Sequence, residues 1–85
     1  MDKELTYEKE VKYYYSNIVG IDLSAYDLKM NFGMITNDKQ NLDEVIQAQV
    51  IMSPQHAKAL LGLLAENISR YEETFGTINI DPLKR

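Results

Sequence analysis

The side chains best suited to chemistry in this chain are one histidine and two aspartates near a predicted turn. His56 is the only histidine and cysteine is absent, so the usual nucleophilic dyads and zinc-ligand spacings are missing. His56 falls at the third position of a predicted helix, where free amides attract anions, but a solvated or capping histidine is the simpler interpretation. Asp22 and Asp27 flank a predicted hairpin and could pair for acid/base work, although solvated turn residues are again simpler. We therefore predict no enzymatic activity, no metal and no cofactor.

Aromatic side chains offer a second kind of chemistry, because the run Tyr13-Tyr14-Tyr15 could stack on bases or on a peptide. In a strand, Tyr14 would face opposite its two neighbours. If Tyr13 and Tyr15 are core residues, Tyr14 is the exposed member and the better binding candidate. Packing in a core or an interface is the preferred interpretation for an acidic chain.

Three segments in which apolar and polar residues alternate are predicted to be strands, and these strands would position the side chains named above. The first predicted strand starts at Tyr13 and runs to Leu23, with a tight connection at Ser24-Ala25. The second covers 26–34, where apolar residues alternate cleanly with polar ones, and the third covers 45–52. A polar loop at 37–41 separates the last two. Consecutive amphipathic strands with short links favour an antiparallel meander.

The junction after the third strand predicts a helix from Pro54 to about Phe75. Ser53 can act as its N-cap, Pro54 suits the first helical position, and Gly76 is placed as a left-handed C-cap residue. Apolar residues spaced 4, 3, 4, 3, 4 form one continuous seam that can cover the sheet. The seam consists of Ala57, Leu61, Leu64, Ile68, Tyr71 and Phe75. The predicted fold class is therefore α+β, a three-stranded antiparallel meander followed by one long C-terminal helix packed on the sheet.

A second apolar strip lies off the helix seam and predicts a second contact, with another helix as the expected partner. It contains Leu63 together with the small residues Ala59 and Gly62, which permit close approach. These three residues and Tyr14 are our candidate interface residues. Ser53, Pro54 and Gly76 are the candidate structural residues.

The two ends of the chain differ in character from its middle. Residues 1–10 are rich in charged side chains, so we expect a flexible arm there. We expect residues 11–85 to form a single domain. After the helix, Ile78 and Ile80 alternate with polar residues, which predicts a short extended segment limited by Pro82.

Size and charge narrow the range of partners. A chain of 85 residues buries only about 60–65% of its unfolded surface and is marginal as a lone unit, so we expect a dimer or a higher oligomer of this chain. The net charge of −4 opposes nucleic acid and anionic membranes as partners. The N-terminus does not read as a signal peptide and no apolar run spans a membrane, so we expect a cytoplasmic location.

Several motifs together resemble a family of short, uncharacterised bacterial and archaeal proteins. They are the run Met52-Ser53-Pro54-Gln55-His56-Ala57-Lys58 and the helix end Glu66-Asn67-Ile68, Tyr71-Glu72, Phe75-Gly76, with Phe32-Gly33 closing the second strand. The resemblance covers roughly residues 13–80 and implies a prokaryotic protein with a shared fold and no assigned reaction. A fainter similarity is to the bacterial protein-export chaperone, in which a long helix also follows an antiparallel sheet.

The sequence thus favours a non-enzymatic, self-associating protein–protein interaction module, with other proteins as further partners. One alternative is a chaperone-like module that holds non-native polypeptide on an apolar groove. Another is a small-ligand binder built at a subunit interface.

Overall fold

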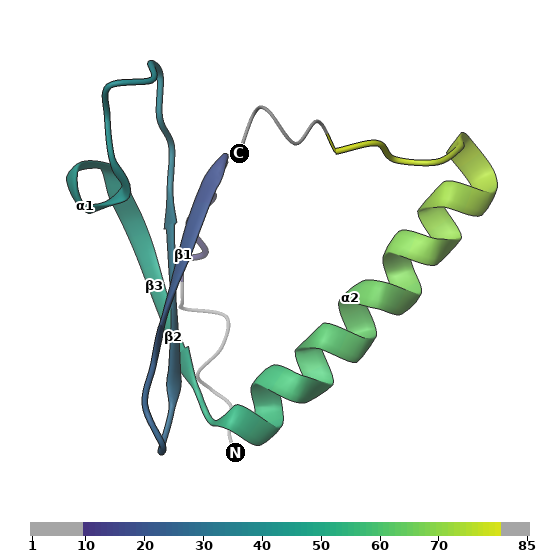
Figure 1. The fold of residues 1–85 in the computed structure, drawn as a ribbon, viewed down its shortest axis with the longest axis horizontal. Helices are drawn as coiled ribbons and strands as arrows, with labels where there is room; N and C mark the ends of the chain where they lie inside the picture. The colour runs from purple at the N-terminus through teal and green to yellow at the C-terminus, as the bar shows by residue number, and fades with distance from the viewer. Residues whose placement is uncertain (1–9, 81–85) are drawn as a thin grey trace.

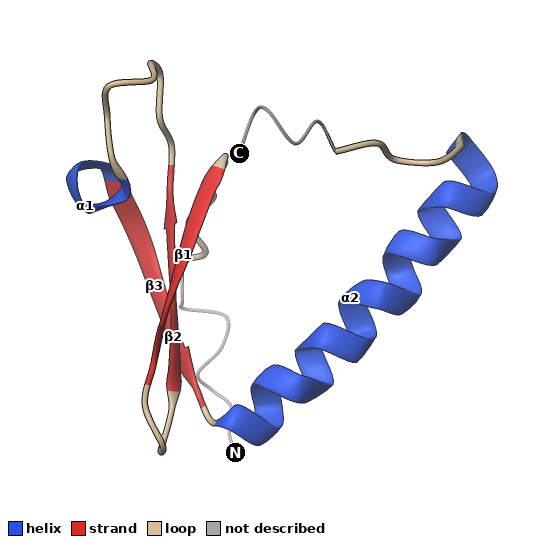
Figure 2. Ribbon diagram, viewed as in Figure 1, coloured by secondary structure: helices blue, strands red, loops and turns tan. Residues whose placement is uncertain are grey.

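The computed structural model describes residues 10–80 as a small sheet followed by a long helix (Figure 1). The order of elements is β1 (Ile18–Leu23), β2 (Leu28–Gly33), α1 (Leu42–Val45), β3 (Ile46–Met52) and α2 (Pro54–Phe75). Figure 2 shows the strands gathered on one side and α2 on the other. This confirms the predicted fold class. The arm predicted for residues 1–10 lies outside the described residues except for Glu10, which is exposed.

The three strands form an antiparallel sheet in the order β1-β2-β3. In the middle of the sheet, Ile21 lies opposite Met30, and Met30 lies opposite Val50. Because directly paired residues share a face, the sheet has one apolar face. This apolar face comprises Val19, Ile21, Leu23, Leu28, Met30, Phe32, Ala48, Val50 and Met52.

The first strand is shorter than the sequence predicts, because it begins at Ile18 and not at Tyr13. Its partner β2 ends at Gly33, which is paired with Ile18, so earlier residues have no strand opposite them. Just before the strand begins, the Asn17 side chain bonds to the backbone of Ile35. It accepts from the Ile35 amide at 2.8 Å and donates to the Ile35 carbonyl at 2.9 Å. The three tyrosines therefore precede the sheet and do not alternate between its faces.

The hairpin between β1 and β2 also differs in detail from the prediction. Its tip is Ala25-Tyr26 and not Ser24-Ala25, since the Ser24 amide donates to the Asp27 carbonyl at 2.9 Å. The Ser24 hydroxyl accepts from the amides of Tyr26 and Asp27, both at 3.1 Å. A serine side chain that folds back on the backbone in this way stabilises a tight turn without an Asn-Gly pair.

The opposite face of the sheet is covered in part by α1, a short helix that the sequence analysis missed. The Leu42 side chain lies over Gly20, and the Val45 backbone lies over Gly33. A Cβ at Gly33 would meet the Val45 backbone and a Cβ at Gly20 would meet the end of the Leu42 side chain, so both glycines permit α1 to approach the sheet closely. α1 therefore belongs to the sheet face that α2 does not meet.

The helix α2 begins and ends at the predicted residues. The Ser53 hydroxyl accepts from the His56 amide at 3.1 Å, and Pro54 occupies the first turn. At the other end the Gly76 amide donates to the Glu72 carbonyl at 2.9 Å. Gly76 has φ 106° and ψ 164°. This is a positive φ, as predicted, but it lies outside the left-handed helical region, so the chain leaves the helix in an extended direction.

Contact between α2 and the sheet is concentrated near the start of the helix. The first turns of α2 lie beside the apolar face, and the helix then diverges from the sheet (Figure 1). Among the described residues, no hydrophobic side chain is fully buried. The radius of gyration is 16.2 Å, compared with about 12 Å for a compact chain of this length. Residues 10–80 of a single copy therefore form no closed core.

Candidate functional site

The residues considered for chemistry make separate local hydrogen bonds. Asp22 accepts from the Asn31 amide group at 3.0 Å, whereas Asp27 accepts from the Ser24 hydroxyl at 3.3 Å. His56 is exposed, and its backbone amide is already bonded to the Ser53 cap. The structure does not join these groups into one site. Within residues 10–80, no three His, Asp or Glu side chains come together in a way that would hold a metal.

The most enclosed polar group lies at the centre of the sheet. Asn31 is 5% exposed and links the outer strands, because it donates to Asp22 in β1 and accepts from the Gln49 amide group in β3 at 2.8 Å. Each of its amide atoms thus has a partner, as a buried amide requires. The network links the three strands on the face away from α2, so Asn31 is accounted for as a structural residue of the sheet.

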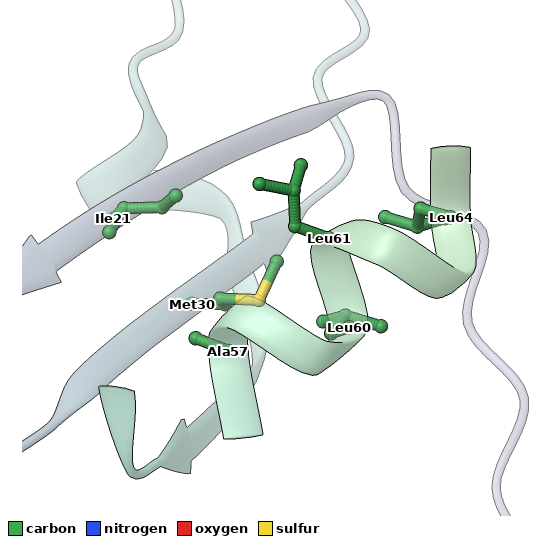
Figure 3. Close-up of a pocket in the computed structure, with 6 residues that line it drawn as sticks. All are labelled: Ile21, Met30, Ala57, Leu60, Leu61 and Leu64. Atoms are coloured by element: carbon green, nitrogen blue, oxygen red, sulfur yellow. The ribbon is translucent and has the colours of Figure 1, made fainter. Parts of the chain in front are cut away.

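An apolar hollow lies where α2 leaves the sheet (Figure 3). Ile21 of β1 and Met30 of β2 form its sheet side. Its helix side comes from the first three turns of α2, from the residues Ala57, Leu60, Leu61 and Leu64. No charged side chain lines it, so the hollow is suited to other apolar side chains and offers no polar group to orient a small ligand.

The rest of the helix seam continues from the hollow into open space. Ile68, Tyr71 and Phe75 are 45%, 50% and 71% exposed, and Leu61 is 68% exposed although it lines the hollow. The rings of Tyr71 and Phe75 contact each other, with centroids 4.8 Å apart. The apolar face of the sheet is similarly open, since Ile21 is 57% exposed. Two apolar surfaces of one chain thus face a common space that neither fills.

The predicted interface residues lie elsewhere on the chain. Ala59, Gly62 and Leu63 are all exposed on α2, away from the hollow. Tyr14 is 54% exposed, but Tyr13 and Tyr15 are more so, at 90% and 77%. The alternation that singled out Tyr14 is therefore wrong. The interface role of these residues stays a prediction.

Sequence reasoning missed two features of this region. The first is α1, for which a signal existed: Asn41 precedes the helix, and the Glu44 carboxylate three residues later accepts from the Asn41 amide at 3.3 Å, a spacing typical of helix N-termini. The second is the divergence of α2. The residues of the seam were recognised, but no sequence pattern states the angle at which a helix leaves a strand.

Residues 2–80 match the model of a family described as a protein of unknown function, DUF3467. No curated protein and no solved structure matches the chain. In the described part of the chain, neither helix has the length and hydrophobicity needed to cross a membrane.

Proposed function

Since the chain belongs to the DUF3467 family, whose function is unknown, we propose its role from its surface: it is a non-enzymatic protein–protein interaction module that self-associates. The observation that carries the proposal is the open helix seam facing an open apolar sheet face. These two surfaces hold nine of the large hydrophobic side chains that are exposed in residues 10–80, four on the sheet face and five on the seam. Continuous apolar surface of this kind marks an interaction site in soluble proteins.

The non-enzymatic part of the proposal rests on the local bonding of the polar side chains. Asp22 and Asp27 serve the sheet and the turn respectively. The buried amide of Asn31 bonds to Asp22 through its nitrogen and to Gln49 through its oxygen. The apolar hollow holds no acid, base or nucleophile, and catalysis requires such groups within reach of a bound substrate.

The direct test is the molar mass of the full chain in solution, measured by sedimentation velocity over a wide range of concentration. We expect a mass of at least two chains, given 9.8 kDa for one. The variant Ile68→Glu places a charge in the helix seam and should dissociate the assembly. The matched control is Ser69→Glu, which adds the same charge at the neighbouring exposed position. A wild-type protein that stays a single folded chain at every concentration would refute self-association.

A chaperone-like module is the second candidate, favoured by Met30 in the wall of the apolar hollow. Methionine is flexible and polarizable, so it adapts to varied apolar segments. Such a module would suppress the aggregation of an unfolded client protein at stoichiometric amounts. Absence of any suppression at excess would leave the self-associating module as the better proposal.

A further inference from the structure

We infer that the space between the sheet and α2 is filled by α2 of a second copy, packed antiparallel and seam against seam. The helix seams and the apolar faces of both sheets would then form one shared core. The inference rests on the proposed self-association and specifies its partner and geometry.

The first argument is the length of α2. Its 22 residues span about 33 Å, whereas strands of six or seven residues span about 20–23 Å. Even if α2 lay flat on its own sheet, roughly 10 Å of helix would extend past the strands. Tyr71 and Phe75 belong to that end of α2. The chain's own sheet therefore cannot cover the whole seam, and the remainder is open to a second molecule.

The second argument is the spacing of the seam. The steps of 4, 3, 4, 3, 4 average 3.6 residues, and their strict alternation is the pattern that a and d positions form in helices that pack on other helices. The order of the steps reads the same in both directions, so a reversed copy presents a matching seam. Reversal places Ala57 opposite Phe75, Leu61 opposite Tyr71 and Leu64 opposite Ile68 of the other copy. Each of the first two pairs sets a smaller side chain against a large aromatic one, as interdigitating layers require.

The third argument concerns direction. Each sheet is attached at the N-terminal end of its helix, and the C-terminal half of α2 stands free (Figure 1). An antiparallel pair brings the free half of each helix toward the other copy's sheet, whereas a parallel pair would bring both sheets to the same end. At 100° per residue, Lys58 and Glu72 lie on the same flank of the seam, so the antiparallel pair also sets each lysine near a glutamate of the other copy.

The surface area agrees with a partner of this size. The chain exposes 7521 Å², and a globular monomer of its mass exposes about 5,200 Å². If the fourteen residues outside the described part are assigned the full accessible surface area of an unfolded chain, an excess of about 500 Å² still remains. The excess therefore lies between about 500 and 2,300 Å² per chain, which brackets the roughly 800 Å² that each partner buries in a standard interface.

The chain has no cysteine, so engineered disulfides test this geometry directly. The single variants Leu61→Cys and Tyr71→Cys are oxidised separately and after mixing and re-equilibration. We expect a covalent dimer mainly in the mixture, because only a reversed partner brings position 61 to position 71. A Ser69→Cys variant, on the outer side of the helix, is the matched control and should give only background dimer.

The outcomes separate the inference from the proposed function. A covalent dimer from Leu61→Cys alone would indicate parallel helices and overturn the inference, as would an assembled protein without cross-links in the mixture. A monomer at all concentrations would overturn both proposals. If a seam variant fails to assemble, the pair Lys58→Cys and Glu72→Cys repeats the test at the margin of the seam. Failure of this pair to cross-link in an assembled protein would also count against the antiparallel geometry.

Discussion

Replacement of Gly62 by alanine distinguishes two surfaces of α2 that could carry the interface. Alanine is more favourable than glycine in a helix interior by about 0.8–1.0 kcal/mol, and a Cβ built on Gly62 meets nothing within 4 Å. Gly62 lies well away from the centre of the helix seam in angle, so seam-to-seam packing leaves it exposed. We therefore expect Gly62→Ala to raise the free energy of unfolding by about 1 kcal/mol per chain, or about 2 kcal/mol per dimer.

The assay is urea unfolding followed by circular dichroism, with wild type and variant at the same chain concentration. The control is Gly76→Ala, the same substitution at a residue with φ 106°, where we expect a loss of about 1 kcal/mol or more because alanine tolerates this conformation poorly. If the strip of Ala59, Gly62 and Leu63 were the close-packed contact instead, the added methyl would cost about 1–3 kcal/mol by overpacking. A destabilised but folded Gly62→Ala protein would thus refute the seam as the main interface.

Two further predictions concern the sheet, both measured as shifts in the urea midpoint. A Cβ on Gly33 would lie 2.6 Å from the Val45 carbonyl oxygen, which is rigid backbone, so Gly33→Ala should lower the free energy of unfolding by about 1–3 kcal/mol. The control Gly20→Ala meets only the end of a flexible leucine side chain and should lower it clearly less. Equal losses for the two variants would contradict this account of α1. Asn31→Ala removes two hydrogen bonds from the central strand and should lower the free energy of unfolding by about 1–3 kcal/mol. Gln49→Ala removes one of these bonds and should lower it less. An unchanged urea midpoint for Asn31→Ala would show that the network does not hold the register.

The sequence predicted the fold wherever a local rule determines the backbone. Ser53 and Pro54 set the start of α2 because a cap and a proline act within one turn. The alternation in β2 was readable because its apolar residues all lie on one face. These signals depend on neighbours in the chain, so they needed no knowledge of what packs against them.

The errors arose where distant residues decide the outcome. Three consecutive tyrosines carry no alternation of hydrophobicity, and the end of β1 depends on where β2 stops, at Gly33. The candidate strip around Leu63 was chosen because the helix seam was assigned wholly to the chain's own sheet. In the structure the seam diverges from that sheet, so Ile68 and Phe75 stay exposed and become the stronger interface candidates.

One face of the sheet is covered within the chain and the other is open, and this difference favours an assembly that closes at a small number of copies. The face with Asn31 is occupied by its hydrogen-bond network and by α1, with Leu42 over Gly20. The apolar face is the one left open, and it lies on the same side as the helix seam. A surface of this kind that pairs with itself around a two-fold axis is used up when two copies meet. Pairing through the free edges of β1 and β3 would instead extend the sheet without limit, and it would leave the apolar face and the seam exposed in every copy. Because burial of apolar surface is the main driving force available to this chain, we expect the closed pair to be the more stable assembly.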